Sequence, residues 1–382
     1  MISKKKALLI AIVLVVLTAL TTSTVTLALG DKVMIERDTY EQYKKYNKLL
    51  ALESVIKEDY YKKPNDESLV DGAIKGLFAG TEDRYSTYYT KEEMNRLMEE
   101  NEGSYVGVGM YIGSSEVGEL TVIPMDGSPA QKGGIKEGDI LVKVSGKLVS
   151  AKNSDEAVSL IKGKEGTTVD LVVKRDGKEK EFKIKREEIV DHTIEGKVVD
   201  DNLGYIKIKQ FINTTYDDFD KELNKLKKKN IKGLVIDLRS NPGGNLEIVG
   251  EVADALIGEG TIVYTKDNKG NTEYIKSDKR KLGLPIVVLT NGESASASEI
   301  LTAAIIDNKA GISVGTKTFG KGLVQSVKGL KDGTGYKLTT AQYFTPNGDY
   351  INEKGIKPTI EEKDESKQLD IAIEWLQKEI AK

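Results

Sequence analysis

The chain has 382 residues, among them 57 Lys and Arg, 60 Asp and Glu, one His and no Cys. Its net charge of −3 argues against broad nucleic-acid binding, which needs a clustered basic face. Without Cys the chain has no disulfides, no thiol nucleophile and no thiolate metal site. The single His, His192, nearly removes His-based metal sites and leaves any His-dependent triad to one residue. The length predicts two or three domains at ~150 residues each.

The N-terminus carries a signal for export. Lys4, Lys5 and Lys6 precede an apolar run without charges from Ala7 to Leu29. This run is long enough to cross ~30 Å of hydrocarbon as a helix, and the lysines place its N-terminal end in the cytoplasm. We expect residues 1–30 to form an uncleaved signal-anchor, so that the protein is a single-pass protein of the cell membrane. The competing interpretation is a cleaved signal peptide with a weak site at Ala28-Leu29-Gly30, and both place the remaining chain outside the cytoplasm.

Two segments of different character follow. Residues 31–102 read as a helical region, in which apolar residues recur at helical spacing and Thr90 to Glu93 form a capping box. Residues 103–188 read as a small β-domain, because short β-rich runs alternate with Gly-rich turns around one helix over Asn153–Lys162. The expected strands are Leu120–Ile123, Ile140–Val144, Val169–Lys174 and Glu181–Lys185.

The last segment, residues 189–382, alternates between strands and helices. This order predicts an α/β fold with a mainly parallel sheet and flanking helices. The chain ends in an amphipathic helix from Gln368 to Ile380. The expected strands are Gly204–Lys209, Gly233–Leu238, Pro285–Thr290 and Ile312–Gly315, and the expected helices lie near Tyr216–Lys229, Asn245–Ile257 and Ser298–Asp307.

The β-domain carries two patterns that resemble the signature of PDZ domains. One runs from Ser128-Pro129-Ala130 to Gly138-Asp139-Ile140-Leu141 and joins a turn, a short helix and a strand. The other, Val106-Gly107-Val108-Gly109, resembles the carboxylate-binding loop of that family, in which consecutive backbone N–H groups point at a peptide C-terminus. A bound peptide then adds a strand to the sheet edge. The alternative is a small β-barrel with Gly turns and no ligand.

Three segments of residues 189–382 point to chemistry. The first, residues 235–245, ends a buried strand in a Pro-Gly-Gly turn and opens a helix, which exposes unpaired N–H donors. The second, residues 289–299, also turns from a strand into a helix and contains Ser-Ala-Ser-Ala-Ser. The third, residues 315–325, places Lys321 between Gly320 and Gly322 just after a strand.

A serine nucleophile needs a base. His192 lies in the link between two domains, away from all three segments, and reads as a surface or packing residue. A lysine can serve instead if burial lowers the pKa of its amine toward neutrality. Lys321 is the candidate, with Gln325 four residues on to hold the amine. Backbone N–H groups of Gly243, Gly244 and Ala297 are candidates for an oxyanion hole.

With these motifs the chain resembles the carboxyl-terminal processing peptidases of the tail-specific serine protease family S41. The resemblance covers about residues 49–382 and includes Asp83-Arg84-Tyr85-Ser86-Thr87-Tyr88 as a further segment. It implies that Ser296 is the nucleophile, Lys321 the base and Gln325 its orienting partner, whereas spacing alone does not separate Ser296 from Ser294 and Ser298. Two departures are Arg84, where the family more often has Pro, and Thr359, where an acid is common.

The resemblance implies a membrane-anchored serine endopeptidase that captures the C-terminal tails of protein substrates through a PDZ domain. It needs no metal and no cofactor, and nucleic acid is not among the expected partners. The family also suggests that peptide binding gates the site and that the terminal helices mediate a homodimer. The main alternative is a non-catalytic PDZ scaffold that binds exported protein tails. A phosphate-binding loop over Gly315–Lys321 is disfavoured because Gly322 stands where that motif needs Ser or Thr.

Overall fold

The computed structural model describes residues 3–29, 35–115 and 117–382. Gly30 of the considered cleavage site lies outside these ranges, as do residues 31–34 at the start of the expected helical region. The chain divides into two compact units, Met1–Ile74 and Lys75–Lys382.

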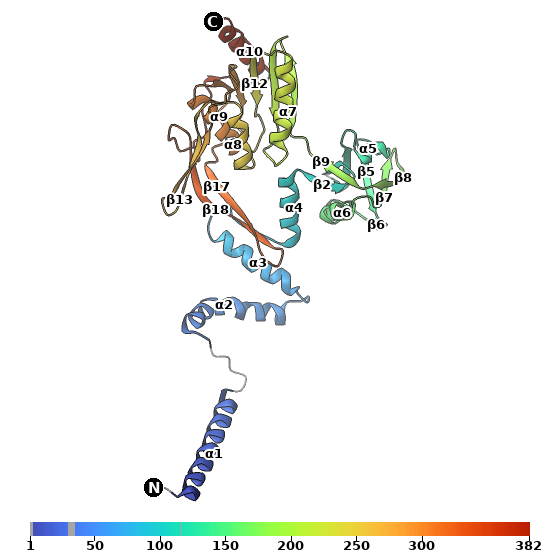
Figure 1. Ribbon diagram of the computed structural model, residues 1–382. Helices are drawn as coiled ribbons and strands as arrows, with labels where there is room; N and C mark the ends of the chain where they lie inside the picture. Colours follow the sequence, from blue (N-terminus) through green and yellow to red (C-terminus); the bar gives the residue numbers. More distant parts are fainter. Residues whose placement is uncertain (1–2, 30–34, 116) are drawn as a thin grey trace. The chain divides into compact units, whose positions relative to one another are not determined.

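The first unit is helical, with α1 (Lys4–Leu29), α2 (Arg37–Asp59) and the start of α3 (Asp66–Ala79) (Figure 1). Helix α1 contains one stretch long and apolar enough to cross a membrane, Lys4–Thr24, with a mean hydropathy of 2.4. None of the residues described in α2 is buried, and its tyrosines and leucines at helical spacing are exposed. The helices expected before Thr90 are therefore present, and the apolar residues of α2 are exposed to solvent within this unit.

The second unit begins with the end of α3 and the strand β1 (Thr87–Tyr89), which interrupts the expected helical region. Helix α4 (Lys91–Glu102) follows and opens with the expected capping box, in which Thr90 and Glu93 exchange hydrogen bonds. Gly103, at φ 69°, ends α4 in the left-handed conformation that suits glycine.

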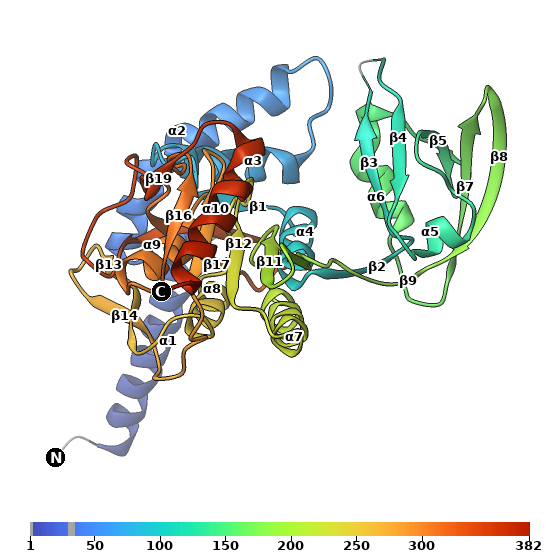
Figure 2. The ribbon, with the colours of Figure 1, turned by 90° about the horizontal axis from the view of Figure 1, so that it is seen from above.

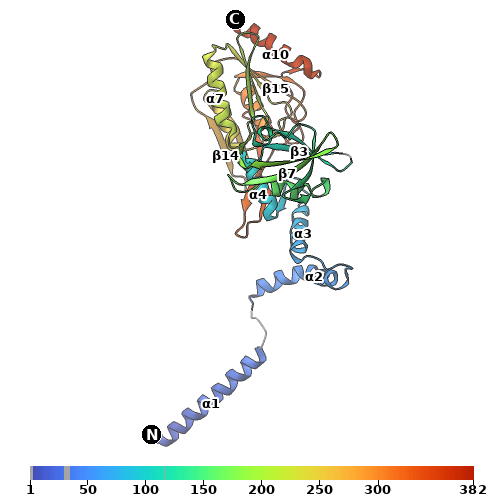
Figure 3. The ribbon, with the colours of Figure 1, turned by 90° about the vertical axis from the view of Figure 1, so that its right-hand side faces the viewer.

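The small β-domain is entered and left through a two-stranded ribbon of β2 (Ser104–Gly107) and β9 (Glu187–Val190) (Figure 2). Its antiparallel sheet has the order β3-β4-β5-β7-β8, with the short β6 (Lys147–Leu148) paired to β5. Figure 3 looks onto this domain, in which β3 and β7 are drawn in green. The strands are β3 (Met110–Ser114), β4 (Leu120–Pro124), β5 (Asp139–Val144), β7 (Thr168–Arg175) and β8 (Lys178–Lys185), and the helices are α5 (Pro129–Lys132) and α6 (Ser154–Ile161). The domain has its own apolar core, to which α6 contributes Ala157 and Ile161.

The α/β region is built on a six-stranded sheet of order β10-β11-β12-β15-β16-β19. Strand β10 is antiparallel to β11, and the other neighbours are parallel. The strands are β10 (Ile194–Val199), β11 (Leu203–Ile208), β12 (Gly233–Asp237), β15 (Ile286–Thr290), β16 (Gly311–Gly315) and β19 (Ile360–Glu361). Every residue of β12 and β15 is buried, which explains their continuous apolar runs.

Helices cover both faces of this sheet. On one face pack α7 (Thr215–Lys228), α8 (Leu246–Asp254) and α9 (Ala297–Asp307), around a core that includes Phe219, Val252 and Leu301. On the other face packs α10 (Glu365–Ile380), through Ala372 and Leu376. The expected amphipathic helix at the C-terminus therefore belongs to the fold of this unit.

A second sheet of this region was not predicted. It is antiparallel, with the order β1-β18-β13-β14 and β17 paired to β18. Its other strands are β13 (Gly260–Asp267), β14 (Thr272–Ser277), β17 (Leu323–Gly329) and β18 (Gly335–Phe344). The expectation of a mainly parallel sheet thus describes one of two sheets. Most residues of β14, β17 and β18 are half-buried or exposed, so these strands lack the apolar runs by which the others were found.

The packing of α10 gives a stability prediction. Leu376→Ala removes a fully buried side chain that faces β12 and β15, and we expect the free energy of unfolding to fall by about 2–5 kcal/mol. The control is Lys378→Ala on the exposed face of the same helix, which should change it by less than about 0.5 kcal/mol. Chemical denaturation measures both. Equal values for the two variants would show that α10 does not cover the sheet.

Candidate active site

The three segments singled out in the sequence follow three neighbouring parallel strands. Residues 238–245 follow β12, residues 291–296 follow β15, and residues 316–322 follow β16. Because the carboxyl ends of parallel strands lie at one edge of a sheet, the topology brings the segments together there. The contacts confirm this: the N–H of Ala295 donates to the carbonyl of Asn241 (3.0 Å), and that of Phe319 to the carbonyl of Ser294 (3.0 Å).

Ser296 stands at the start of α9 in a strained backbone conformation, with φ 54° and ψ −113°. A left-handed φ is uncommon outside glycine, and such strain gathers at functional sites. Gly243 packs directly against it, since a Cβ atom at Gly243 would lie 2.8 Å from the Cβ of Ser296 and 2.9 Å from the backbone nitrogen of Ala297. Only glycine fits at position 243.

The structure separates the three serines that the spacing left equivalent. Ser294 is fully buried, and its hydroxyl donates to the carbonyl of Leu238 (2.8 Å). Ser298 is fully buried as well, and its hydroxyl donates to the carbonyl of Asn241 (3.0 Å). Ser296 alone of the three is partly exposed. Its hydroxyl is therefore the one that a substrate can reach.

Glu299, which the sequence analysis did not single out, joins the serine segment to the lysine segment. Its carboxylate is fully buried and accepts four hydrogen bonds. One oxygen accepts the N–H groups of Ser296 (2.9 Å) and Lys321 (2.8 Å). The other accepts the N–H of Gly320 (2.8 Å) and the hydroxyl of Thr318 (2.6 Å). The main chains of the candidate nucleophile and base are thus fixed to one oxygen atom.

The amine of Lys321 lies in a half-buried site. Its Nζ is 4.7 Å from the ring centroid of Tyr85. The pKa of Lys321 is lowered from its ordinary value, first by burial and then by the positive charges of Lys337 and Arg84, while Asp83 and Glu299 oppose the shift. A lowered pKa increases the neutral fraction of the amine at a given pH, which is the form that accepts a proton.

The side chains of Ser296 and Lys321 are in one site but are not hydrogen-bonded to each other: in the part of the chain that the structure describes, no hydrogen bond joins Nζ of Lys321 to the hydroxyl of Ser296. The hydroxyl of the buried Tyr343 lies between the two segments: it donates to the carbonyl of Lys321, and Ser296 forms a side-chain hydrogen bond with it. Burial raises the pKa of Tyr343 well above its ordinary value, so the phenol stays protonated.

Gln325 does not hold the lysine amine in this conformation. It lies on β17 beside a register shift against β18, and its amide nitrogen donates to the carbonyl of Leu323 (3.2 Å) and the hydroxyl of Thr339 (3.4 Å). The structure therefore places Gln325 near the site through the β17–β18 pair, without the expected contact to Lys321.

The three expected oxyanion donors differ in availability. The N–H of Gly243 already donates to the side-chain oxygen of Asn241 (2.8 Å). Among the described residues, the N–H groups of Gly244 and Ala297 have no acceptor. Ala297 is the first residue of α9, whose N–H points out of the helix start, and the helix dipole favours negative charge there. Gly244 and Ala297 are the free donors in this conformation.

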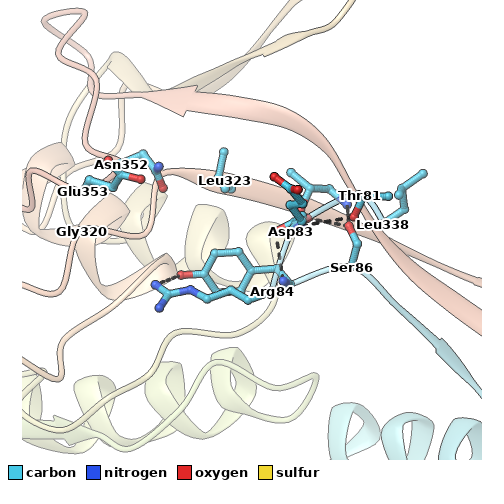
Figure 4. A pocket seen from close by; sticks show the side chains of 12 residues that line it. Thr81, Asp83, Arg84, Ser86, Gly320, Leu323, Leu338, Asn352 and Glu353 are labelled. Carbon is cyan, nitrogen blue, oxygen red and sulfur yellow. Dashed lines mark hydrogen bonds between the residues drawn. The ribbon is translucent and has the colours of Figure 1, made fainter. Parts of the chain in front are cut away.

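A cavity of about 840 Å³ opens beside Lys321 (Figure 4). It lies between the loop of residues 81–86 and the strands β17 and β18, and Leu323 and Leu338 form its apolar part. Asp83, Arg84 and Ser86 line it from the loop, and Gly320 from the lysine segment. This cavity gives a polypeptide room next to the candidate base.

Half of the expected peptide-binding loop of the β-domain lies in a paired strand, and the other half has free N–H groups. Val106 and Gly107 belong to β2 and pair with β9. Val108 is buried, Gly109 takes φ 71°, and within the described residues the N–H groups of both have no acceptor. They precede β3, which lies at the edge of its sheet and, among the described strands, pairs with β4 alone. Two free N–H donors at the start of a strand with an unpaired edge are suited to bind the carboxylate of a peptide. The rest of the peptide can then pair with that edge as an added strand.

Three residues of this site were not predicted to take part in it. Glu299 had a signal, because it stands three residues after Ser296, the spacing of a capping box at a helix start. Tyr85 was noted in a family segment without a role, and Tyr343 had no such signal. They reach the site because β1 pairs with β18, and that pairing joins segments more than 240 residues apart.

The role of Glu299 gives a prediction. Glu299→Gln replaces one acceptor oxygen by an NH₂ donor, which then faces two of the four donors. We expect the free energy of unfolding to fall by about 2–4 kcal/mol, since each unsatisfied buried donor costs about 1–3 kcal/mol. Glu293→Gln, at an exposed glutamate of the same segment, is the control and should be neutral. Thermal and urea unfolding measure both, and an unaffected Glu299→Gln protein would contradict the assignment.

Comparisons with known proteins agree with this arrangement. The model described as peptidase family S41 matches residues 202–362, a PDZ domain model matches 124–175, and the model described as the activating protease CtpB N-terminal domain matches 19–93. The "carboxy-terminal processing protease CtpA" of Bacillus subtilis is 38% identical over 352 residues, which cover 91% of this chain and 76% of that protein. A "probable CtpA-like serine protease" of Staphylococcus aureus is 39% identical over 323 residues, covering 82% of this chain and 64% of that protein.

Among solved structures, the photosystem II D1 C-terminal processing protease matches with a TM-score of 0.51 and 28% identity, covering 83% of this chain and 87% of that one. Sequence similarity over nearly the whole chain and this structural match point to the same group of proteins. The chain therefore belongs to peptidase family S41, the carboxy-terminal processing serine peptidases, and carries a PDZ domain.

Proposed function

We propose that this chain is a membrane-anchored endopeptidase that cleaves protein substrates with a Ser–Lys pair. The hydroxyl of Ser296 attacks a peptide carbonyl while the neutral amine of Lys321 accepts its proton. The N–H groups of Gly244 and Ala297 stabilise the oxyanion, and Lys321 returns the proton to the leaving amine. Water then hydrolyses the acyl-enzyme by the same route, and the pair needs no metal or cofactor.

One arrangement carries this proposal: Ser296 is the only partly exposed residue of the three clustered serines, and its N–H donates to the same Glu299 oxygen as the N–H of Lys321. His192 is not a competing base. It is 70% exposed, and its Nδ1 lies 2.7 Å from Asp218, in a different part of the fold from the three loops.

The proposed step requires a movement of the lysine side chain. Nζ rests over Tyr85 and has to turn toward Ser296 before it accepts the proton. The main chain of Lys321 is held by Glu299 and Tyr343, so rotation about side-chain bonds supplies the movement. Gln325 is proposed to hold the amine in that second position, and the present conformation is then a resting one.

We propose further that the PDZ domain binds the C-terminal tails of substrates. The free N–H groups of Val108 and Gly109 receive the carboxylate, beside Val106 and Gly107 of the same motif, and the tail pairs with the open edge of β3. Helix α1 is proposed to anchor the protein in the cell membrane with the peptidase outside the cytoplasm. The exposed apolar residues of α2 suit a homodimer contact.

The absence of a hydrogen bond between Nζ of Lys321 and the Ser296 hydroxyl among the described residues favours one other function, a PDZ scaffold without catalysis. Cleavage of an unstructured protein by the purified full-length chain separates the two. We expect Ser296→Ala and Lys321→Ala each to lower the cleavage rate by about a thousandfold or more, because the nucleophile and its base act as a unit. Lys317→Ala, at an exposed lysine of the same loop, is the matched control and should keep the rate.

Three results of that assay bear on the proposal. Loss of cleavage in the Ser296 and Lys321 variants, with cleavage kept in Lys317→Ala, supports the Ser–Lys pair. A scaffold gives no cleavage by any form, and equal rates in all forms would assign the cleavage to a contaminating protease.

The PDZ proposal is tested on the ligand. A peptide with a free C-terminal carboxylate should bind the Ser296→Ala protein about tenfold or more tightly than the same peptide with a C-terminal amide. The reason is that the amide loses charge-assisted hydrogen bonds worth about 1.5–3 kcal/mol. Fluorescence anisotropy of the labelled peptides gives both affinities. Equal affinities would rule out carboxylate capture.

A further inference from the structure

Two cations lie against the ring of Tyr85. The Nζ of Lys321 is 4.7 Å from the ring centroid, and the guanidinium carbon of Arg84 is 4.8 Å from it. Arg84 also donates a hydrogen bond from Nη2 to the Tyr85 hydroxyl (2.6 Å), drawn as a dashed line in Figure 4. The candidate base and a permanent cation therefore share one aromatic side chain.

Arg84 is not neutralised by a carboxylate. None of the ion pairs found among the described residues includes it, and its other close neighbour is the ring of Phe319, 5.6 Å away. The adjacent Asp83 directs its oxygens to the Ser86 hydroxyl (2.6 Å) and the N–H of Tyr85 (3.0 Å) instead. A guanidinium keeps its charge at every pH at which an enzyme works, so its effect on a neighbouring amine is constant.

The charged groups around the Lys321 amine, Arg84 included, come from three elements. Lys337 on β18 and Arg84 on the 81–86 loop disfavour the ammonium form, as does burial. Asp83 on that loop and Glu299 on α9 favour it. The ring of Tyr85 lies under the amine, and the protonated Tyr343 binds the carbonyl of the same residue. The face of Tyr85 by itself attracts an ammonium, and the guanidinium of Arg84 on the same ring opposes that attraction together with burial and Lys337.

We propose that Arg84 is a positioning residue for the reaction: bound to the Tyr85 hydroxyl, it holds a positive charge beside the Lys321 amine and keeps that amine uncharged for the attack by Ser296. This inference rests on the proposed function. In this proposal, the loop of residues 81–86 sets the pH at which the Lys321 amine becomes active as a base. Tyr85 provides the surface on which the amine rests, and Arg84 provides the charge.

The test is the pH dependence of peptide cleavage by the full-length protein. Because the pKa of Lys321 is lowered and the neutral amine is the active form, the rate should rise with pH as Lys321 loses its proton. Arg84→Gln removes the opposing charge, so the ammonium persists and the rise should move to higher pH by about half a unit or more. Arg84→Lys keeps a cation at this position and should retain most of the wild-type profile.

Two controls separate this effect from a structural one. Lys331→Gln removes one cation from the turn between β17 and β18, which is not among the charges that act on Lys321, and should leave the profile unshifted. Arg84 is exposed, so the displacement caused by Arg84→Gln should shrink in 1 M salt, where the Debye length is about 3 Å. A lower rate at every pH without displacement would mean that Arg84 acts only through the shape of the loop, and would overturn the proposal.

A second measurement does not depend on turnover. Brief acetylation of the Ser296→Ala protein at a series of pH values, followed by mass spectrometry of the peptide that contains Lys321, gives the pH at which this amine becomes reactive. Adding Arg84→Gln should move that midpoint upward, and an unchanged midpoint would overturn the role of Arg84. Absence of cleavage by the wild-type chain would instead overturn the proposed function, so the two failures are distinguishable.

Discussion

The arrangement of the site depends on one buried carboxylate. Glu299 lies in the first turn of α9, where a helix start favours negative charge, and four N–H and O–H donors saturate its oxygens. No cation within the described ranges pairs with it, so its stability in the fold comes from hydrogen bonds alone. Two of the donors belong to Ser296 and Lys321, which follow different strands. The separation of their main chains is therefore set by a single side chain, and removing an acceptor there leaves buried donors unpaired on both segments at once.

A fixed main chain leaves the lysine side chain as the movable part. The carbonyl of Lys321 is held by Tyr343 and its N–H by Glu299, whereas the ring of Tyr85 is the only contact found for its amine among the described residues. An ammonium on an aromatic face gains about 0.5–2 kcal/mol, which is small enough for the amine to leave on the time scale of side-chain rotation. A base that moves in this way need not be aligned with Ser296 in every conformation. The absence of the Ser–Lys hydrogen bond here is consistent with an intact site.

Much of this site could be predicted from the sequence, because its loops follow buried parallel strands. Apolar runs such as Gly233–Asp237 identify those strands, and their common direction places the loops at one edge of the sheet. The antiparallel sheet could not be found in this way, since its strands are half-exposed and pair over long separations. The contact between Lys321 and Tyr85 could not be predicted for that reason, because Tyr85 reaches the site through the pairing of Thr87 with Lys337. The sequence pattern predicts neither the register of these strands nor the burial that distinguishes Ser296 from its neighbouring serines.

The proposed use of Lys321 as the base makes the charges around its amine decisive. A carboxylate close to the amine raises its pKa and so opposes proton transfer, and Glu299 and Asp83 both act in that direction. Each of these carboxylates accepts several hydrogen bonds. These bonds fix the positions of the donor groups and limit how strongly the carboxylate stabilises the ammonium form of Lys321. Burial and nearby cations act more strongly the other way, so the pKa of Lys321 is lowered despite two neighbouring acids. The carboxylates of the site thus fix the main chain, while burial and the nearby cations lower the pKa of the proposed base.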